Sequence, residues 1–417
     1  MKSYVTISLG CKVNSYEISA LVSRLKERGY VEDKINPTVA IINTCSVTAT
    51  ADQKSRQHIR KLINTYKDAI IVVMGCYSQG QHKFIAEEIK ANIITGTSNR
   101  DKLVDLIENY KGGVIDITDE KSRLFNLYEE LGVTNHSENV RAYLKIQDGC
   151  DNFCSYCLIP YRRGKARSRN HLDVIKEATS LVKFGYKEIV LTGIHVGGYG
   201  KDLTNETFSN LVKDLLDTNV YRLRISSIEA SEIDDELIKL INEKENLANH
   251  FHIPLQSGSD TVLKRMNRKY NKEEFLKTLT KIREACPNVA FTTDVIVGFP
   301  GESDEEFMET YNFIKKCGFN MLHVFPFSSR EGTAASRLPN HIDPKIKKER
   351  VNKLLDLSNR LWEEYENRFI NKEVEVLVEQ YDEINHLNIG HTSNYLEVKI
   401  PSRENKVGQI VKTIYKK

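Results

Sequence analysis

Residues 141–157 read RAYLKIQDGCDNFCSYC, a β-rich apolar run that leads directly into three cysteines. Cys150, Cys154 and Cys157 form a CxxxCxxC pattern at the carboxyl end of a strand predicted at 143–147. Three thiolates on one short loop can bind three irons of a [4Fe-4S] cluster and leave the fourth iron open to an outside ligand. A zinc site without its fourth ligand and three buried apolar cysteines are the alternatives, and the spacing and placement favour the cluster.

Strands and helices alternate on the C-terminal side of this motif, a pattern typical of a (β/α) barrel. The predicted strands are 142–147, 188–192, 222–226, 251–255, 291–297 and 321–325. The predicted helices include 172–184, 232–241, 272–285 and 303–316, and a long helical pattern runs from 344 to about 369. Six strand–helix units are too few for a full eight-fold barrel, so we expect an open or partial (β/α)6 barrel.

The same alternation on the N-terminal side predicts a doubly wound parallel sheet. Its strands are expected at 4–9, 39–43, 69–74 and 92–95, and its helices at 15–28, 49–66, 81–90 and 100–110. Cys11, Cys45 and Cys76 follow the first three of these strands. Because ligands bind where the carboxyl ends of parallel strands meet, we infer a second three-cysteine cluster, again with an open iron. Three unrelated buried cysteines are the alternative, and Cys286 and Cys317 are interpreted as structural.

By this pattern the chain belongs to the α/β class and divides into three domains, with a linker between the first two. We expect a doubly wound domain at 1–125, a polar linker at 126–140, the partial barrel at 141–370 and a small all-β domain at 371–417. The last segment contains alternating strands in VEVLVEQ, YLEVKIP and GQIVKTIY, separated by Gly, Asn and Ser turns. These strands predict a small β-barrel or sheet.

The composition is that of a folded multidomain protein, with 417 residues, 40% of them hydrophobic, and 60 Lys and Arg against 57 Asp and Glu. This balance argues against disorder, collagen and a coiled coil. Apolar runs such as 69–74 are far shorter than the ~20 residues of a membrane span, and residues 1–10 lack the features of a signal peptide. We expect a cytoplasmic protein with no membrane partner, whose clustered cysteines bind metal or react instead of forming disulfides.

Polar and glycine-rich segments mark the ends of the predicted barrel strands. Thr192 and Gly193 stand in LTGIHVGGYG, which follows the second strand, and IVGFPGES follows the fifth. Glu229 and Gln256 lie at the ends of the third and fourth strands. Polar groups at one mouth of a barrel suit a cofactor with amino acid and ribose parts, whereas ordinary tight turns and exposed polar residues are the alternatives.

A basic run, RRGKARSR, follows the cysteine motif directly at 162–169. Arg162, Arg163, Lys165 and Arg167 could neutralise RNA phosphates, and Tyr161 offers a face on which a base could stack. A solvated loop is the alternative.

Together these motifs resemble the methylthiotransferase family of radical S-adenosylmethionine (SAM) enzymes over nearly the whole chain. The resemblance is carried by SLGCKVNSYE, INTCSVT, MGCYSQ and KIQDGCDNFCSYCLIPYRRGKARSR, in the family's order, and continues through LTGIHVGGYG, RISSIEAS, HIPLQSGSDTVLKRMNRKY, DVIVGFPGE and HVFPFSSREGTAA. It implies an N-terminal domain that holds an auxiliary [4Fe-4S] cluster through Cys11, Cys45 and Cys76. It also implies a radical SAM barrel that holds the SAM-cleaving cluster through Cys150, Cys154 and Cys157. Tyr156 resembles the aromatic residue that packs beside the adenine of SAM, and the tail resembles the RNA-binding TRAM domain.

Within the family, LGCKVN and DNFCSYCLIPYRRG most resemble the branch that modifies N6-threonylcarbamoyladenosine at position 37 of tRNA. The implied product is 2-methylthio-N6-threonylcarbamoyladenosine, and SAM serves as both radical source and methyl donor. The implied partners are this tRNA, an electron donor such as flavodoxin or ferredoxin, and a sulfur donor. The alternatives are a sister enzyme that methylthiolates an aspartate of a ribosomal protein, a branch that acts on isopentenyladenosine, and, in another class, a non-catalytic iron–sulfur or RNA-binding protein.

Overall fold

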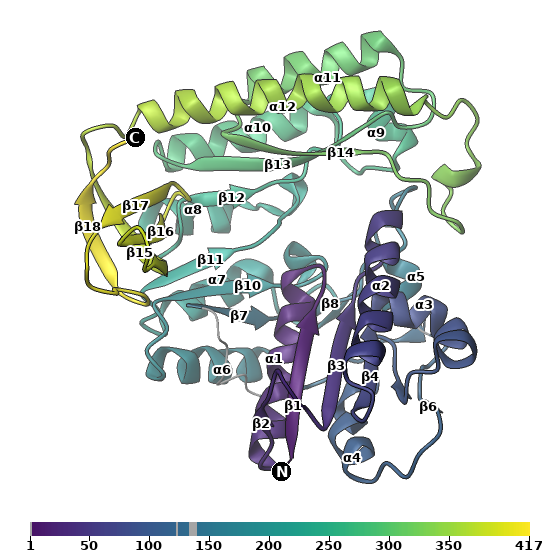
Figure 1. The fold of residues 1–417 in the computed structure, drawn as a ribbon. Helices are drawn as coiled ribbons and strands as arrows, with labels where there is room; N and C mark the ends of the chain where they lie inside the picture. The colour runs from purple at the N-terminus through teal and green to yellow at the C-terminus, as the bar shows by residue number, and fades with distance from the viewer. Residues whose placement is uncertain (1, 122–123, 133–139) are drawn as a thin grey trace.

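The computed structural model describes residues 2–121, 124–132 and 140–417. Residues 133–139 of the expected linker, 126–140, therefore lie outside the described residues. In Figure 1 the N-terminal sheet lies at the lower right, the barrel strands lie to its left and above it, and the C-terminal sheet lies at the left in yellow. In the part of the chain that the structure describes, no helix has both the length and the apolar composition needed to cross a membrane.

The N-terminal domain is a six-stranded sheet in the order β2-β1-β3-β4-β5-β6, and all its pairings are parallel. Its strands are β1 (Ser3–Ser8), β2 (Val31–Glu32), β3 (Val39–Thr44), β4 (Ile70–Gly75), β5 (Ile93–Ile94) and β6 (Ile115–Asp116). Its α-helices are α1 (Lys12–Glu27), α2 (Ala49–Thr65), α3 (Cys76–Phe84) and α4 (Leu103–Glu108).

Both faces of this sheet are buried, which explains why its strands appear in the sequence as uninterrupted apolar runs. Successive strand residues point to opposite faces, so Ile41 packs in one apolar cluster and Ile42 in another. The first cluster is completed by α1 and α4, and the second by α2 and α3. The expected doubly wound arrangement is therefore confirmed.

Six parallel strands form the expected partial barrel. They are β7 (Arg141–Lys145), β10 (Glu188–Thr192), β11 (Arg222–Ile225), β12 (His250–His252), β13 (Ala290–Val297) and β14 (Met321–Pro326). They pair as β11-β10-β7 and β12-β13-β14, and parallel bridges such as Ser227 with His252 join the two halves. The barrel is therefore open between its edge strands β7 and β14.

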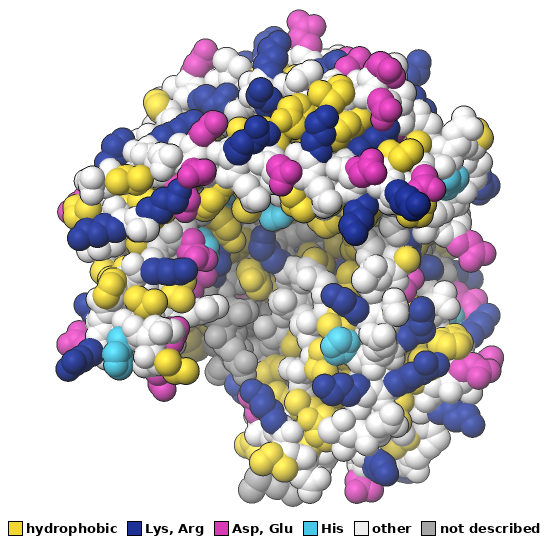
Figure 2. Space-filling model, turned by 45° about the horizontal axis from the view of Figure 1, so that its top comes forward, with side chains coloured by type: hydrophobic (Ala, Val, Ile, Leu, Met, Phe, Trp, Pro, Cys, Tyr) yellow, Lys and Arg dark blue, Asp and Glu magenta, His cyan; other side chains and the backbone are white. Residues whose placement is uncertain are grey.

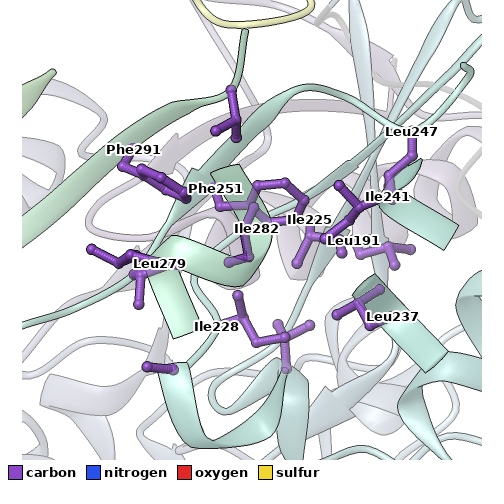
Figure 3. Close-up of a cluster of buried hydrophobic side chains, with 14 of the residues drawn as sticks. Leu191, Ile225, Ile228, Leu237, Ile241, Leu247, Phe251, Leu279, Ile282 and Phe291 are labelled. Carbon is purple, nitrogen blue, oxygen red and sulfur yellow. The ribbon is translucent and has the colours of Figure 1, made fainter. Parts of the chain in front are cut away.

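Helices cover the outside of the barrel: α6 (His171–Lys183), α7 (Phe208–Leu216), α8 (Asp235–Glu243), α10 (Lys272–Ala285), α11 (Asp304–Cys317) and α12 (Pro344–Asn367). Two short helices, α5 (Ile159–Arg163) and α9 (Asp260–Arg265), lie in loops. Figure 3 shows the core between strands and helices, where Leu191, Ile225 and Phe251 of the strands face Leu237 of α8 and Ile282 of α10. This burial fixes the strands whose carboxyl ends carry the site.

The C-terminal domain is a four-stranded antiparallel sheet in the order β17-β16-β15-β18. Its strands are β15 (Glu373–Asp382), β16 (Leu387–Thr392), β17 (Glu397–Pro401) and β18 (Ile410–Ile414). The Arg224 guanidinium donates to the carbonyl oxygens of Thr392 and Ser393. Tyr395 stacks on His250 of β12, with ring centroids 4.6 Å apart. The C-terminal domain therefore packs against the amino ends of the barrel strands.

The N-terminal domain contacts both open edges of the barrel. On one side, α1 packs against β7, where Glu17 accepts a hydrogen bond from Lys145 at 3.0 Å. On the other side, Arg330, which follows β14, forms an ion pair with Asp52 of α2 at 2.6 Å. The two domains thus enclose a space beside the open barrel, and Figure 2 shows a hollow near the middle of one face of the molecule.

Candidate functional site

The barrel cysteines lie on the loop that follows β7 and the short strand β8 (Gln147–Asp148). Burial, together with the neighbouring thiols, raises the pKa values of Cys150 and Cys157 to about 12. Without a cation, these groups are therefore neutral thiols near pH 7, and iron would displace their protons. Phe153 has φ of +47°, so the backbone of this loop is strained between the first two cysteines.

A cluster of polar side chains lies against the same loop. The Arg268 guanidinium donates to Cys154 Sγ at 3.2 Å and forms an ion pair with Glu229 at 2.9 Å. The Asn152 amide also donates to Glu229, at 3.2 Å. Arg268 therefore places a cation where it would offset the negative charge of a cluster bound through Cys154.

Cys11, Cys45 and Cys76 lie at the carboxyl ends of β1, β3 and β4, on one edge of the N-terminal sheet. The Asn14 amide donates to the carbonyl oxygens of Leu9 and Thr44, and so ties together the loops that bear Cys11 and Cys45. Gly10 has φ of +95°, and a Cβ there would lie 2.7 Å from Cys45 Sγ. Glycine is therefore needed beside these cysteines for both conformation and space.

The donor set of each site suits a cluster better than a single ion. In the described ranges, no group of three or more His, Cys, Asp or Glu converges closely enough to hold one metal ion. A tetrahedral zinc ion would need sulfurs about 2.3 Å from one centre, whereas a cube of iron and sulfide spaces its thiolate ligands more widely. Three thiols without a fourth protein ligand match the cubane with one open iron.

A buried network of charges joins the two domains directly behind Cys76. Arg163 donates from Nε to Cys76 Sγ at 3.1 Å, and from its other nitrogens to Glu17 at 2.8 Å and Asn14 at 2.9 Å. The ion pairs connect four cations with three carboxylates: Arg100, Lys145, Arg163, Arg167, Glu17, Glu129 and Asp148. The network thus has one more cation than carboxylates, and its Arg163 contacts the Cys76 thiol. A cluster bound through thiolates is anionic, and a neighbouring cation would stabilise it.

The two cysteine sets face each other across the domain boundary. Burial raises the pKa of Cys157, and among the neighbouring charges that raise it further is the thiolate of Cys76 from the other domain. Arg163, which contacts Cys76, belongs to α5, the first helix after the barrel cysteines. The structure therefore brings both sets to one place, although they lie in separate domains.

Two of the residues expected at a cofactor site line one pocket of about 200 Å³. Tyr156 and Gln256 contribute from the barrel, and Val47 and Thr48 contribute from the loop that follows Cys45. Gln256 has φ of +63°, a strained conformation that is concentrated at binding sites. Apolar residues such as Ile296 complete the lining, so the pocket suits a flat apolar group with polar edges, such as the adenine of SAM.

The other expected cofactor residues lie elsewhere on the same rim. Glu229 lies beside Cys154 in the polar cluster described above. Thr192 is buried, and its carbonyl accepts a hydrogen bond from Ile146. Gly193 packs against Gln147, where a Cβ would lie 3.2 Å from the Gln147 carbonyl oxygen. Thr192 and Gly193 therefore support the base of the cysteine loop and do not line the pocket.

The basic run is folded into the interior for most of its length. Residues 167–168 form β9, which pairs with β8 and draws the run back beside the cysteine loop. Arg163 and Arg167 are buried and occupied by ion pairs, so neither reaches an RNA phosphate in this structure. Arg162 is half-buried against Gly80 of α3, and Lys165 is exposed. The structure thus leaves Arg162 and Lys165 as the accessible cations among the four expected RNA contacts.

The sequence reasoning did not identify Arg268 and Arg330, which hold the site together. Arg268 lies in a loop that follows α9, and Arg330 lies in the segment after β14. Each works through partners far away in sequence: Cys154 and Glu229 for Arg268, and Asp52 for Arg330. Arg268 lies in HIPLQSGSDTVLKRMNRKY and Arg330 lies in HVFPFSSREGTAA, two of the segments that resemble the family. This resemblance is the signal in the sequence that points to the two arginines.

Comparison with known proteins agrees with the fold. A model of the Radical SAM superfamily matches residues 144–314, and a model of Uncharacterized protein family UPF0004 matches residues 3–96. The radical SAM methyltransferase TsrM from Kitasatospora setae has the same fold, with a TM-score of 0.59 and 13% identity over 81% of this chain and 74% of that chain. A partial barrel with this cysteine motif and this match defines a radical SAM protein, a class that uses SAM and a [4Fe-4S] cluster.

The relatives in sequence are more specific. The Threonylcarbamoyladenosine tRNA methylthiotransferase MtaB of Bacillus subtilis (strain 168) is 47% identical over 97% of this chain and 92% of its own length. The tRNA-2-methylthio-N(6)-dimethylallyladenosine synthase of Alkaliphilus oremlandii (strain OhILAs) is 35% identical over 98% of this chain and 89% of its own length. The chain belongs to the radical SAM methylthiotransferase family, in the branch of the MtaB proteins.

Proposed function

We propose that this chain methylthiolates C2 of N6-threonylcarbamoyladenosine at position 37 of tRNA and forms 2-methylthio-N6-threonylcarbamoyladenosine. In this proposal Cys150, Cys154 and Cys157 hold the cluster that cleaves SAM, and the three cysteines of the N-terminal domain hold an auxiliary [4Fe-4S] cluster. The observation that carries the proposal is the meeting of two three-cysteine sets at one domain boundary. The identity with the Bacillus subtilis protein, whose name specifies threonylcarbamoyladenosine, supports the choice of substrate.

The cofactors, when bound, supply a 5′-deoxyadenosyl radical that can remove hydrogen from an unactivated carbon such as adenine C2, together with a methylated sulfur. The protein supplies geometry and electrostatics. Arg268 and Arg163 place a cation beside Cys154 and Cys76, one in each set. The pocket that contains Tyr156 and Gln256 opens between the barrel and the Cys45 loop, so a group bound there lies between the two sets. This arrangement favours successive use of both centres on one nucleoside.

The proposed partners are tRNA, an electron donor such as flavodoxin or ferredoxin, and a sulfur donor, all in the cytoplasm. Arg162 and Lys165 are the cations of the basic run that we propose to contact RNA. A groove of about 1050 Å³ between α12 and the C-terminal domain is lined by Lys399, Lys416 and Lys417 together with the carboxylates of Glu366 and Glu397. Lysines in such a groove could neutralise phosphates without reading sequence.

Mass spectrometry of tRNA nucleosides tests the proposed function. A host that lacks its own enzyme would express the wild-type chain, the Cys154→Ala variant or an empty vector. The wild-type chain is expected to convert N6-threonylcarbamoyladenosine to its 2-methylthio derivative, and the variant is expected to leave it unmodified. If the wild-type chain instead methylthiolates isopentenyladenosine or a ribosomal-protein aspartate, the proposed substrate is wrong. If it yields no modification and no 5′-deoxyadenosine, the enzymatic proposal itself fails.

A further inference from the structure

A second, smaller pocket lies inside the barrel, beneath the one that contains Tyr156 and Gln256. Its volume is about 120 Å³, and its lining comes from all three domains: Lys12 from α1, Tyr395 from the C-terminal domain, and the other residues mostly from barrel strands. Cationic or imidazole side chains dominate the lining: Lys12, Arg141, Arg224, His250, His252 and His323. A pocket of this size has room for about four water molecules or one small branched group, and not for a nucleoside base.

One lining residue of each pocket contacts a lining residue of the other. Asp294 lines the upper pocket, and His252 lines the lower one. His252 Nε2 lies 3.3 Å from Asp294 Oδ1. Lys12 in turn directly follows Cys11, at the first position of α1. The lower pocket is therefore next to both the expected SAM pocket and the auxiliary cysteines.

The cations of the lower pocket differ in whether they are already paired. The Arg224 guanidinium is occupied by Glu188 and by carbonyl oxygens of the C-terminal domain. Arg141 forms an ion pair with Glu379 at 2.7 Å. Lys12 lines the pocket and has no ion pair or hydrogen bond to any residue within the described ranges. Because Arg141 and Arg224 are already paired, Lys12 is the side chain of this lining that an anion would pair with, and none of the described lining residues is a carboxylate.

We propose that this pocket binds the threonyl end of the N6-threonylcarbamoyl group and that Lys12 pairs with its carboxylate. The inference rests on the proposed function and assigns a specificity-determining residue to it. The threonyl end carries a carboxylate, a hydroxyl and a methyl group. Met321 and Val190 of the lining offer apolar contact for the methyl group. The Thr292 hydroxyl already bonds to His250 and His252, so the carboxylate, and not the hydroxyl, is the group that the proposal assigns to a protein partner.

The same pocket disfavours an uncharged N6 substituent. An isoprenyl group would bury Lys12 without a counter-charge, and an unpaired buried cation is costly. A site rejects the wrong substrate most strongly when that substrate leaves a buried polar or charged group of the protein without a partner, and a difference in size alone has a smaller effect. Lys12 would thus separate an acidic from an apolar N6 chain.

The test uses anticodon stem–loop RNAs that carry either N6-threonylcarbamoyladenosine or its methyl ester, which removes the charge and retains the chain. Binding to the cluster-loaded full-length protein is measured without SAM, and turnover is measured with SAM. The wild-type protein is expected to bind the acid about 10- to 100-fold more tightly than the ester, as for one charged hydrogen-bonded pair. Lys12→Gln is expected to abolish this preference, and Lys12→Arg is expected to retain most of it.

Lys61→Gln serves as the matched control, because Lys61 is an exposed lysine on α2 and lines neither pocket. Iron content and the EPR spectrum check that Lys12→Gln has kept both clusters, since Lys12 neighbours Cys11. Equal binding of acid and ester by the wild-type protein would overturn the inference without any variant. A preference for the acid that persists in Lys12→Gln would also overturn it. Failure of the wild-type protein to methylthiolate the acid RNA would count against the proposed function. The preference for acid over ester in binding tests the role of Lys12 separately, because it is measured without SAM.

Discussion

Replacement of Arg163 by methionine is expected to lower the reduction potential of the cluster held by Cys11, Cys45 and Cys76. The Arg163 side chain is fully buried, and its Nε donates to Cys76 Sγ at 3.1 Å. Reduction adds negative charge to a cluster, and a buried cation on a ligand sulfur stabilises that charge. For a one-electron reduction, a loss of about 1.4 kcal/mol of this stabilisation lowers the reduction potential by about 59 mV. We therefore expect the reduction potential to fall by tens of millivolts.

The same substitution should also lower the free energy of unfolding. Arg163 contacts the buried carboxylates of Glu17 at 2.8 Å and Asp148 at 3.1 Å. Removal of one partner from a buried ion pair costs about 3–5 kcal/mol. Because Lys145 still pairs with both carboxylates in the variant, we expect a loss at the lower end, about 3 kcal/mol.

The assay is a potentiometric titration followed by EPR, in a background where Cys150, Cys154 and Cys157 are replaced by alanine so that only the N-terminal cluster contributes. Arg169→Met is the matched control: Arg169 is also buried near the domain boundary, but it pairs with Glu130 and Glu177 and not with a cysteine. The control should lose stability and keep its potential. An unchanged potential in Arg163→Met with a full complement of iron would refute the reasoning.

Three further predictions follow from the packing. Burial alone would raise the pKa of Glu188, but Arg224, Arg222 and Arg141 together outweigh burial and lower it to about 2. The resulting stabilisation is present above pH ~4.5 and is lost as pH falls toward 2. The melting temperature should therefore fall more steeply between pH 5 and 3 in the wild type than in Glu188→Gln. Cys286→Ala should leave the iron content unchanged, because Cys286 is buried in the barrel core and belongs to neither set, and loss of iron would contradict this assignment. Tyr395→Ala removes the ring that stacks on both His250 and His391 and should cost about 1–3 kcal/mol. Residues 373–417 should then be the first segment exposed to proteolysis, which a digestion time course can check.

Much of the fold could be predicted because the sheet strands are buried on both faces. All six residues of β3 are buried, and this produces the uninterrupted run expected at 39–43. The sequence pattern predicts a helix from 81, and this start is wrong, because α3 begins at Cys76. Gly75, with φ of +104°, turns the chain directly into the helix, and a segment of Cys, Tyr, Ser and Gln has little helical preference by which to show this.

The meeting of the cysteines could be predicted in part, and the role of the basic run could not. Strand-end positions place Cys11, Cys45 and Cys76 on one edge by topology alone. A run of arginines, however, has the same composition whether it is solvated or buried. The partner Glu17 of Arg163 lies in the other domain, 146 positions away, so only the tertiary structure reveals the pair. Burial of a charge depends on such distant partners, which local composition does not record.

The central claim is that the two cysteine sets hold two clusters with separate tasks. The most direct test compares Cys45→Ala and Cys154→Ala with the wild-type protein in vitro, with dithionite, SAM and RNA that contains N6-threonylcarbamoyladenosine, and measures 5′-deoxyadenosine and the methylthiolated nucleoside in the same reaction. We expect Cys154→Ala to yield neither product, and Cys45→Ala to yield 5′-deoxyadenosine without the methylthiolated nucleoside. Formation of the methylthiolated nucleoside by Cys45→Ala would contradict the account.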